Sequence, residues 1–433
     1  MPVNQIPTRV TAAQDLYVRL MRGDHSPFHL CAHSLTPTLL GAEPQDGPNP
    51  LTGDQPPPLV PSNPRPESVP EPQIQDAPKI EDASQPRVVL LGTGGGPPAV
   101  AHRANTATAV VIGDAVYVVD CGRGAVSAYV NAGLSLGHLR AIFVTHMHAD
   151  HNGELINFFL YGLHPQGPAG GGLPARIQVF GPGRSDELIA MGAPIESPIC
   201  PSAPMSGTAD LLSHSIAAHA GHLNVAIAAG FPDIREAIAV TELTVATADN
   251  QVSPLATDLG LQVVTADLGV VDAGANSEPA PAMDPVVIME DDRVRVSAIL
   301  VPHGGMFPAL AYRFDTDSGS VVVSGDTAKS ENVVALAAGS DLLLHEVMDA
   351  EAMIASGMPE QFVREILLQV HTDSVEVGEV GSEAGVKRIA LHHFVPSQPG
   401  AVGDDQWRRQ VSRHYDGEVI VGQDLMSIPL GTH

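Results

Sequence analysis

The chain has few cysteines and lacks several features that would assign it to a common class. Its apolar runs are all shorter than a membrane span. Charged residues such as Asp15 and Arg19 interrupt any signal-peptide pattern, so we expect a cytoplasmic protein. A G-x-S-x-G nucleophile elbow is absent. Three widely spaced cysteines exclude a disulfide framework and a C-x-x-C metal site: Cys31, Cys121 and Cys200.

Basic residues are also scarce. The 433 residues include 22 basic and 49 acidic side chains, which gives a net charge of −27. Such a charge repels polyanions, and a nucleic-acid-binding protein usually carries a basic patch. We therefore expect a small-molecule substrate, with neither nucleic acid nor a membrane as partner. The sequence leaves open whether the chain forms a homodimer.

Proline divides the chain into two regions. The stretch from about Gly41 to Pro86 is dense in proline and polar residues, so residues 1–86 are predicted to form a disordered arm and linker. From residue 87 to 433, strand and helix patterns alternate, which is typical of an α/β domain. An insertion is expected at about 185–285. Its Ala-rich part, Leu211 to Val240, predicts helices, and Asp267 to Asp284 predicts a loop.

The richest chemistry lies directly after an apolar run, Ala141 to Val144, that is typical of a buried strand. Three imidazoles and a carboxylate follow within six positions: His146, His148, Asp150 and His151. These groups are the ligands that hold zinc or a similar divalent metal. Further apolar runs lead into more candidates: Asp120, His303, Asp326 and the pair His392-His393. Ligands at strand ends are held by the sheet, so the series predicts a metal centre at a sheet edge.

This series resembles the metallo-β-lactamase superfamily, whose hallmark H-x-H-x-D-H stands at His146 to His151. Within it, the stretches LGTGGGPPAVAHRANTATAVV, VPHGGMFPALAYRF and SGDTAKSENVVALAAGSDLLLHEV resemble the arylsulfatase and ribonuclease Z branch. The resemblance implies an α/β fold, a four-layer αββα sandwich with a helical insertion. It also implies two metal ions in a groove at one edge.

Carried over position by position, the resemblance implies a ligand for every part of a binuclear centre. The first metal would be held by His146, His148 and His303, and the second by Asp150, His151 and His393, with Asp326 between them. Asp120 would orient a ligand histidine. We expect two Zn²⁺ ions per chain, with Mn²⁺ or Fe as alternatives. His392 would face away from the centre, as strand neighbours do.

Two metal ions can hold a bridging hydroxide at neutral pH and stabilise charge on the attacked atom. Catalytic candidates are Asp150 for its place in the centre, and His345 or His371 as general acid. His345-Glu346 resembles the His-Glu-Ala-Thr motif of ribonuclease Z, although Val347-Met348 depart from it.

The residues favour a metal-dependent hydrolase of small sulfate or phosphate esters, like an arylsulfatase or phosphodiesterase. Three alternatives stay open. A ribonuclease Z-type tRNA 3′ endonuclease would need tight tRNA binding with a steep salt dependence. A lactonase or β-lactamase would share every metal ligand. A non-catalytic binding module would not need two ions per chain.

Overall fold

Two β-sheets lie face to face in the computed structural model, which describes residues 85–163, 172–174, 176–185, 197–246, 252–271 and 280–431. Sheet A has eight strands in the spatial order β15 (Ser427–Pro429), β1 (Arg87–Gly92), β2 (Ala107–Ile112), β3 (Ala115–Val119), β4 (Leu139–Phe143), β5 (Ile177–Pro182), β6 (Ile238–Ala246) and β7 (Gln262–Val271). Sheet B has seven in the order β14 (Glu418–Val421), β13 (Arg388–Val395), β12 (Leu342–Met348), β11 (Gly319–Val323), β10 (Leu310–Thr316), β9 (Arg295–Leu300) and β8 (Val286–Glu290). The predicted arm, residues 1–86, lies outside the described residues except for its last two.

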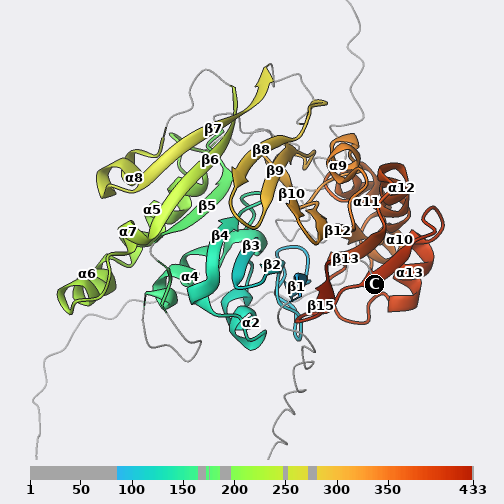
Figure 1. Ribbon diagram of the computed structural model, residues 1–433. Coiled ribbons are helices and arrows are strands. Elements are labelled where there is room, and N and C mark those ends of the chain that lie inside the picture. The colour runs from blue at the N-terminus through green and yellow to red at the C-terminus, as the bar shows by residue number, and fades with distance from the viewer. Residues whose placement is uncertain are drawn as a thin grey trace, which may run out of the picture.

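Helices cover the outer face of each sheet (Figure 1). The helices that precede sheet B in the chain are α2 (Ala125–Asn131), η1 (Leu136–His138), α3 (Ala149–Asn152), α4 (Leu155–Gly162), α5 (Thr208–Ala218), α6 (Ala220–Ala228), α7 (Ile234–Ala237) and α8 (Pro254–Leu259). The later ones are α9 (Glu331–Ala337), α10 (Ala350–Ala355), α11 (Glu360–Glu365), η2 (Leu367–Gln369), α12 (Ser374–Ala384) and α13 (Asp404–Val411). The chain therefore has the four-layer αββα sandwich that the family resemblance implied. No helix in the described part is long and apolar enough to cross a membrane.

Apolar residues on both faces of the strands explain the layers. Every residue of β2 and β3 is buried, because one face meets the other sheet and the opposite face meets helices. Between the sheets, the ring of Phe143 stacks on Phe180 and meets Phe314 edge-on, with centroids 5.0 and 5.1 Å apart. Outside, Tyr129 of α2 and Phe158 of α4 pack on sheet A.

Strand direction determines which ends meet. Strands β3 to β7 run parallel to one another, so their carboxyl ends share one edge of sheet A. In sheet B, β9 is antiparallel to β10 and β10 to β11, while β11, β12 and β13 are parallel. The carboxyl ends of β9, β11, β12 and β13 therefore lie at one edge as well.

The insertion contains strands as well as helices. The predicted helices are present from Thr208 to Ala228, and α6 projects away from the sandwich in Figure 1. However, the chain turns into β6 at Ile238, and β7 continues to Val271, where a loop was predicted from Asp267. Both strands extend sheet A: β6 pairs with β5, and β7 pairs with β6. This pairing outweighs the weak local pattern.

A buried carboxyl in this insertion links stability to pH. Glu242 is 1% exposed and accepts the Ala209 N–H at 2.9 Å. Burial raises the pKa of Glu242 from 4.5 to about 7. The folded state thus holds this proton more tightly than the unfolded chain. The resulting stabilisation is complete below about pH 4.5 and is lost as pH rises towards 7, by roughly 3 kcal/mol.

Glu242→Gln should therefore remove much of the fall in unfolding free energy between about pH 4.5 and 7, because an amide keeps the acceptor but cannot ionise. This fall is measured as the difference in unfolding free energy between pH 5 and pH 8, from denaturant unfolding of wild type and variant. The exposed Glu290→Gln is the matched control. If both variants follow the wild-type pH dependence, the Glu242 carboxyl does not cause it.

Candidate metal centre

Seven histidine and aspartate side chains from both sheets meet at the strand ends. His146 and His148 lie in the loop after β4, and α3 begins at Ala149 directly behind them. His303 follows β9, and Asp326 follows β11. The two sheets are joined beside this point, because Leu310 N–H donates to Thr145 O at 2.9 Å. The remaining members are Asp150 and His151 in α3 and His393 in β13.

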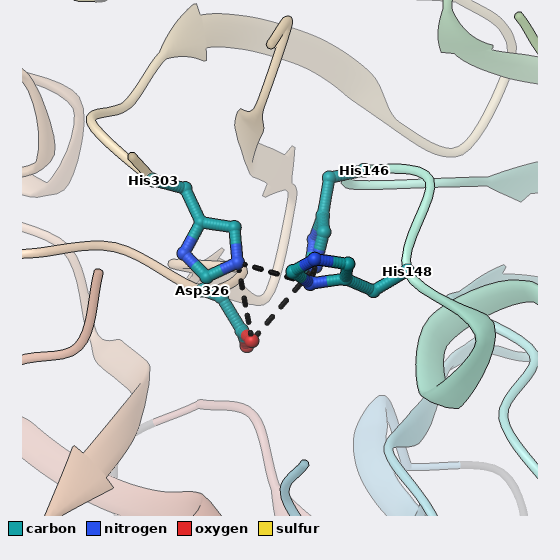
Figure 2. Close-up of side chains that lie close together, drawn as sticks. All are labelled: His146, His148, His303 and Asp326. Atoms are coloured by element: carbon teal, nitrogen blue, oxygen red, sulfur yellow. Dashed lines mark hydrogen bonds and ion pairs between the residues drawn. The ribbon is translucent and has the colours of Figure 1, made fainter. Parts of the chain in front are cut away.

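The first cluster consists of three imidazoles around one carboxylate (Figure 2). His148 Nδ1 lies 3.0 Å from His146 Nε2 and 3.2 Å from His303 Nε2. Asp326 Oδ2 lies 3.8 Å from His146 Nε2 and 3.7 Å from His303 Nε2. All four ligand atoms are within 4.8 Å of one another, so this cluster could hold a metal ion.

The second cluster shares Asp326 with the first. His393 Nε2 lies 3.1 Å from Asp326 Oδ2 and 3.3 Å from Asp150 Oδ2. His151 Nε2 lies 3.2 Å from Asp326 Oδ1 and 3.6 Å from Asp150 Oδ2. His151 Nε2 and Asp326 Oδ1 are buried without a hydrogen-bond partner. Buried polar atoms without partners are costly, and a divalent metal would satisfy both, so these residues fit one.

The charge states of the first cluster suit metal binding. Burial lowers the pKa of His146 well below its usual value, and the imidazoles of His151 and His303 lower it further. Burial likewise lowers the pKa of His148, and that of His303 to about 3. These rings are therefore neutral at pH 7, which is the form that binds a metal.

The carboxylates dominate the second cluster. Burial opposes the charge on His151, but Asp326 and Asp120 raise the pKa of His151 well above its usual value. Burial also opposes the charge on Asp326, whereas His151 and His393 lower the pKa of Asp326 well below its usual value. Asp150 behaves similarly, with its pKa lowered mainly by His151 against the effect of burial. This excess of negative charge favours a cation at the site.

Asp120 lies beside the second cluster and contacts His151. Its Oδ2 is 2.8 Å from His151 Nδ1, which leaves Nε2 facing the centre. Asp120 also accepts the Thr145 N–H at 2.8 Å and the Thr145 O–H at 2.9 Å. On the opposite side, His303 Nδ1 donates to Val370 O at 2.7 Å. Such partners select the tautomer and direction of metal-binding imidazoles.

A third group, Glu346 and His371, adjoins both clusters. Glu346 Oε1 lies 3.2 Å from His371 Nδ1, and the His371 ring is 5.6 Å from the rings of His303 and His393. The His371 side chain is 12% exposed, so it reaches the surface of the site. Burial would lower the pKa of His371, but Glu346 raises it to about 9. His371 was predicted from the sequence as a catalytic candidate, whereas Glu346 was not.

His345 and His392 lie outside these groups. His345 is fully buried, and its Nδ1 donates to Glu346 O at 2.7 Å. Burial lowers the pKa of His345. His392 Nδ1 lies 3.3 Å from Thr106 Oγ1, while its neighbour His393 faces Asp326. Neighbouring residues of a strand point to opposite faces, so Glu346 faces His371 whereas its neighbour His345 points away.

Comparisons with known proteins agree with this chemistry. Residues 87–166 match the family described as anti-Pycsar protein Apyc1. Ribonuclease Z of Mycobacterium bovis (strain BCG / Pasteur 1173P2) is 27% identical over 339 residues, covering 78% of this chain and 96% of that protein. Ribonuclease Z of Mycolicibacterium gilvum is 25% identical over 342 residues, covering 78% and 94%.

Solved structures give more distant similarities. The short form of human tRNase Z is 19% identical with a TM-score of 0.49, over 80% of this chain and 100% of that one. The metallo-β-lactamase fold protein YhfI from Bacillus subtilis is 16% identical with a TM-score of 0.45, over 79% and 98%.

The αββα sandwich, the two histidine and aspartate clusters and the ribonuclease Z relatives together define a metal-dependent hydrolase. Its divalent cofactor would be held by the histidines and aspartates of the two clusters. Its sequence is similar to that of ribonuclease Z over most of the length of those proteins, and its fold is the αββα sandwich that the resemblance to the metallo-β-lactamase superfamily implied.

Proposed function

We propose that this chain is a metal-dependent phosphodiesterase of the ribonuclease Z type, with a precursor tRNA as the first substrate to test. The observation that carries the proposal is the pair of clusters sharing Asp326, with Glu346 and His371 beside them. Ribonuclease Z relatives that align over almost their whole length support this substrate class better than the small sulfate or phosphate ester expected from the sequence.

The proposed ligands are the seven residues of the two clusters, with Zn²⁺ as the preferred ion at each. Two divalent ions would supply an activated water and stabilise negative charge on the phosphorus. Asp120 and Val370 would hold the imidazoles of His151 and His303 in the required tautomer. Asp150 contributes a carboxylate to the second cluster and would help to hold an ion there.

His371 is the proposed general acid. It lies between both clusters, reaches the surface and is paired with the Glu346 carboxylate. Glu346 Oε1 also accepts the Thr327 N–H at 3.2 Å and the Thr372 N–H at 3.1 Å, so it is rigidly held next to Asp326. A proton on His371 could pass to the leaving oxygen when the ester bond breaks.

A second candidate is a small sulfate or phosphate ester. The net charge of −27, with only 22 basic side chains in 433 residues, favours a small substrate over a polyanionic RNA. A lactonase or β-lactamase would use the same ligands, and a binding module would hold the metal without turnover.

A substrate comparison tests these proposals. Purified protein loaded with Zn²⁺ or Mn²⁺ should be assayed on precursor tRNA, bis(p-nitrophenyl) phosphate, p-nitrophenyl sulfate and a lactone. Cleavage of the precursor at its 3′ side, with an affinity that falls steeply as salt rises, is the expected result. Turnover of the sulfate with no cleavage of RNA would favour the second candidate. Metal binding without turnover of any substrate would favour the binding module.

Metal removal should destabilise the fold, because the clusters take ligands from loops of both sheets. Free metal at a thousand times its Kd contributes about 4 kcal/mol. A chelator should therefore lower Tm by roughly 5–10 °C, and added Zn²⁺ should restore it. Thermal unfolding before and after chelation measures the shift. An unchanged Tm after complete removal of metal would contradict a link between the sheets through the metal.

A further inference from the structure

The turn between β14 and β15 reaches a loop at the other end of the chain. Asp424 Oδ1 accepts the Thr93 N–H at 2.9 Å and the Thr93 O–H at 2.7 Å. Its Oδ2 accepts the Ala104 N–H at 2.6 Å. Both carboxylate oxygens are thus used, and together they fix both ends of one loop, Thr93–Asn105. Gly94 N–H also joins the two ends of this loop, because it donates to Ala104 O at 2.8 Å.

This loop lies directly against the ring of His393. A Cβ on Gly95 would be 2.6 Å from His393 Nδ1 and 2.9 Å from His393 O, so only glycine fits there. Gly96 N–H lies 3.4 Å from His393 Nε2. The loop therefore packs against the His393 ring and limits its position.

The backbone of His393 also depends on this loop. His393 has a φ of 46°, a left-handed conformation that a non-glycine residue holds only when its surroundings require it. Both neighbouring hydrogen bonds come from the loop. Phe394 N–H donates to Thr93 O at 3.0 Å, and Gly95 N–H donates to Phe394 O at 3.3 Å.

We propose that Asp424 is a positioning residue for the second metal cluster. By fixing both ends of Thr93–Asn105, it holds the loop that sets the ring and backbone of His393. This inference rests on the proposed metal centre. Asp424 itself does not contact the cluster, so its effect passes through Thr93 and Gly95 to His393.

A carboxylate suits this role better than an amide. Asparagine offers one acceptor oxygen, and its NH₂ would face either the Ala104 N–H or the Thr93 donors. The turn itself does not need the side chain, because Leu425 N–H donates to Leu90 O at 2.7 Å and Leu90 N–H to Met426 O at 2.9 Å. Asp424→Asn should therefore keep β15 in place and release only the loop.

Zinc titration of metal-free protein tests the proposal, with calorimetry to separate two binding events and Co²⁺ spectra to report each ligand set. Asp424→Asn should weaken one of the two sites about 10- to 100-fold and leave the other near its wild-type Kd. The matched control is Asp341→Ala. Asp341 likewise accepts the N–H and O–H of one residue, Ser320, but at the start of β12, away from the clusters. It should lower Tm and leave both Kd values unchanged.

Gly95→Ala tests the same contact from the loop side without altering Asp424. Its Cβ displaces His393, so the same site should weaken at least as much. Unchanged Kd values in both variants, or equal weakening of both sites, would overturn the positioning role. Wild-type protein that binds no metal would overturn the metal centre itself, and this inference with it, before any variant is compared.

Discussion

His148→Ala should reduce turnover by roughly 10³-fold or more, equivalent to about 4 kcal/mol of activation free energy. His148 Nδ1 lies at the middle of the first cluster, 3.0 Å from His146 Nε2 and 3.2 Å from His303 Nε2. Without it, the remaining ligands bind a metal weakly and cannot fix an activated water. Steady-state kinetics and metal analysis by mass spectrometry of the same sample measure the two effects.

His138→Ala is the control, since His138 is an exposed histidine outside both clusters. It should keep wild-type turnover and metal content. Full activity of His148→Ala with unchanged metal content would remove His148 from the proposed ligands.

His371→Ala should slow esters of poor leaving groups far more than activated ones, by about 10²- to 10⁴-fold for an alkyl or ribose leaving group. A nitrophenyl group leaves as a stable anion and needs little help from an acid. Metal content should stay the same, because His371 lies beside the proposed ligand set. Comparing kcat for the two substrate classes in wild type and variant measures the selectivity.

Two further variants locate the proton donor. Glu346→Gln keeps an acceptor for His371 but removes the negative charge, so it should reproduce the same selectivity in weaker form. His345→Ala should slow both substrate classes alike, since His345 is fully buried. If His345→Ala alone shows the leaving-group selectivity, the proton comes from His345 and the present assignment to His371 is wrong.

Several strands were predictable because they are apolar on both faces and end in polar ligands, whereas the four-layer sandwich was implied by the family resemblance. Runs such as Val116 to Val119 and Ala141 to Val144 predicted β3 and β4 to within two residues. The insertion was less predictable. Strand β6 is stabilised by pairing with β5, and β7 by pairing with β6, rather than by their own pattern. Such pairing between separate segments leaves little trace in a single sequence.

In the candidate site, one dense motif carried most of the information. The series His146 to His151 and the strand-end position of Asp326 are local signals. The relation between Glu346 and His371 is not local, because it depends on which face of β12 points inward and on the loop before α12. Neighbouring side chains of a strand point to opposite faces, so only one of Glu346 and His345 can face the site. The sequence alone does not show which face of β12 that is. Asp424 gave no signal, because its partner Thr93 is 331 residues away.

The pairing of β15 with β1 has a consequence for synthesis of the protein. Val88 of β1 pairs with Ile428 of β15, so β1 leaves the ribosome long before its partner strand has been made. Until then one edge of β1 is open, and open edges are where chains join wrongly. A shortened messenger, or a protease that removes the turn with Asp424 and β15, would leave that edge exposed. It would also remove the Asp424 hydrogen bonds to Thr93 and Ala104. Sheet A is thus complete only once β15 has been made, and copies truncated before β15 should be recognised by quality control as misfolded rather than persist as partly active enzyme.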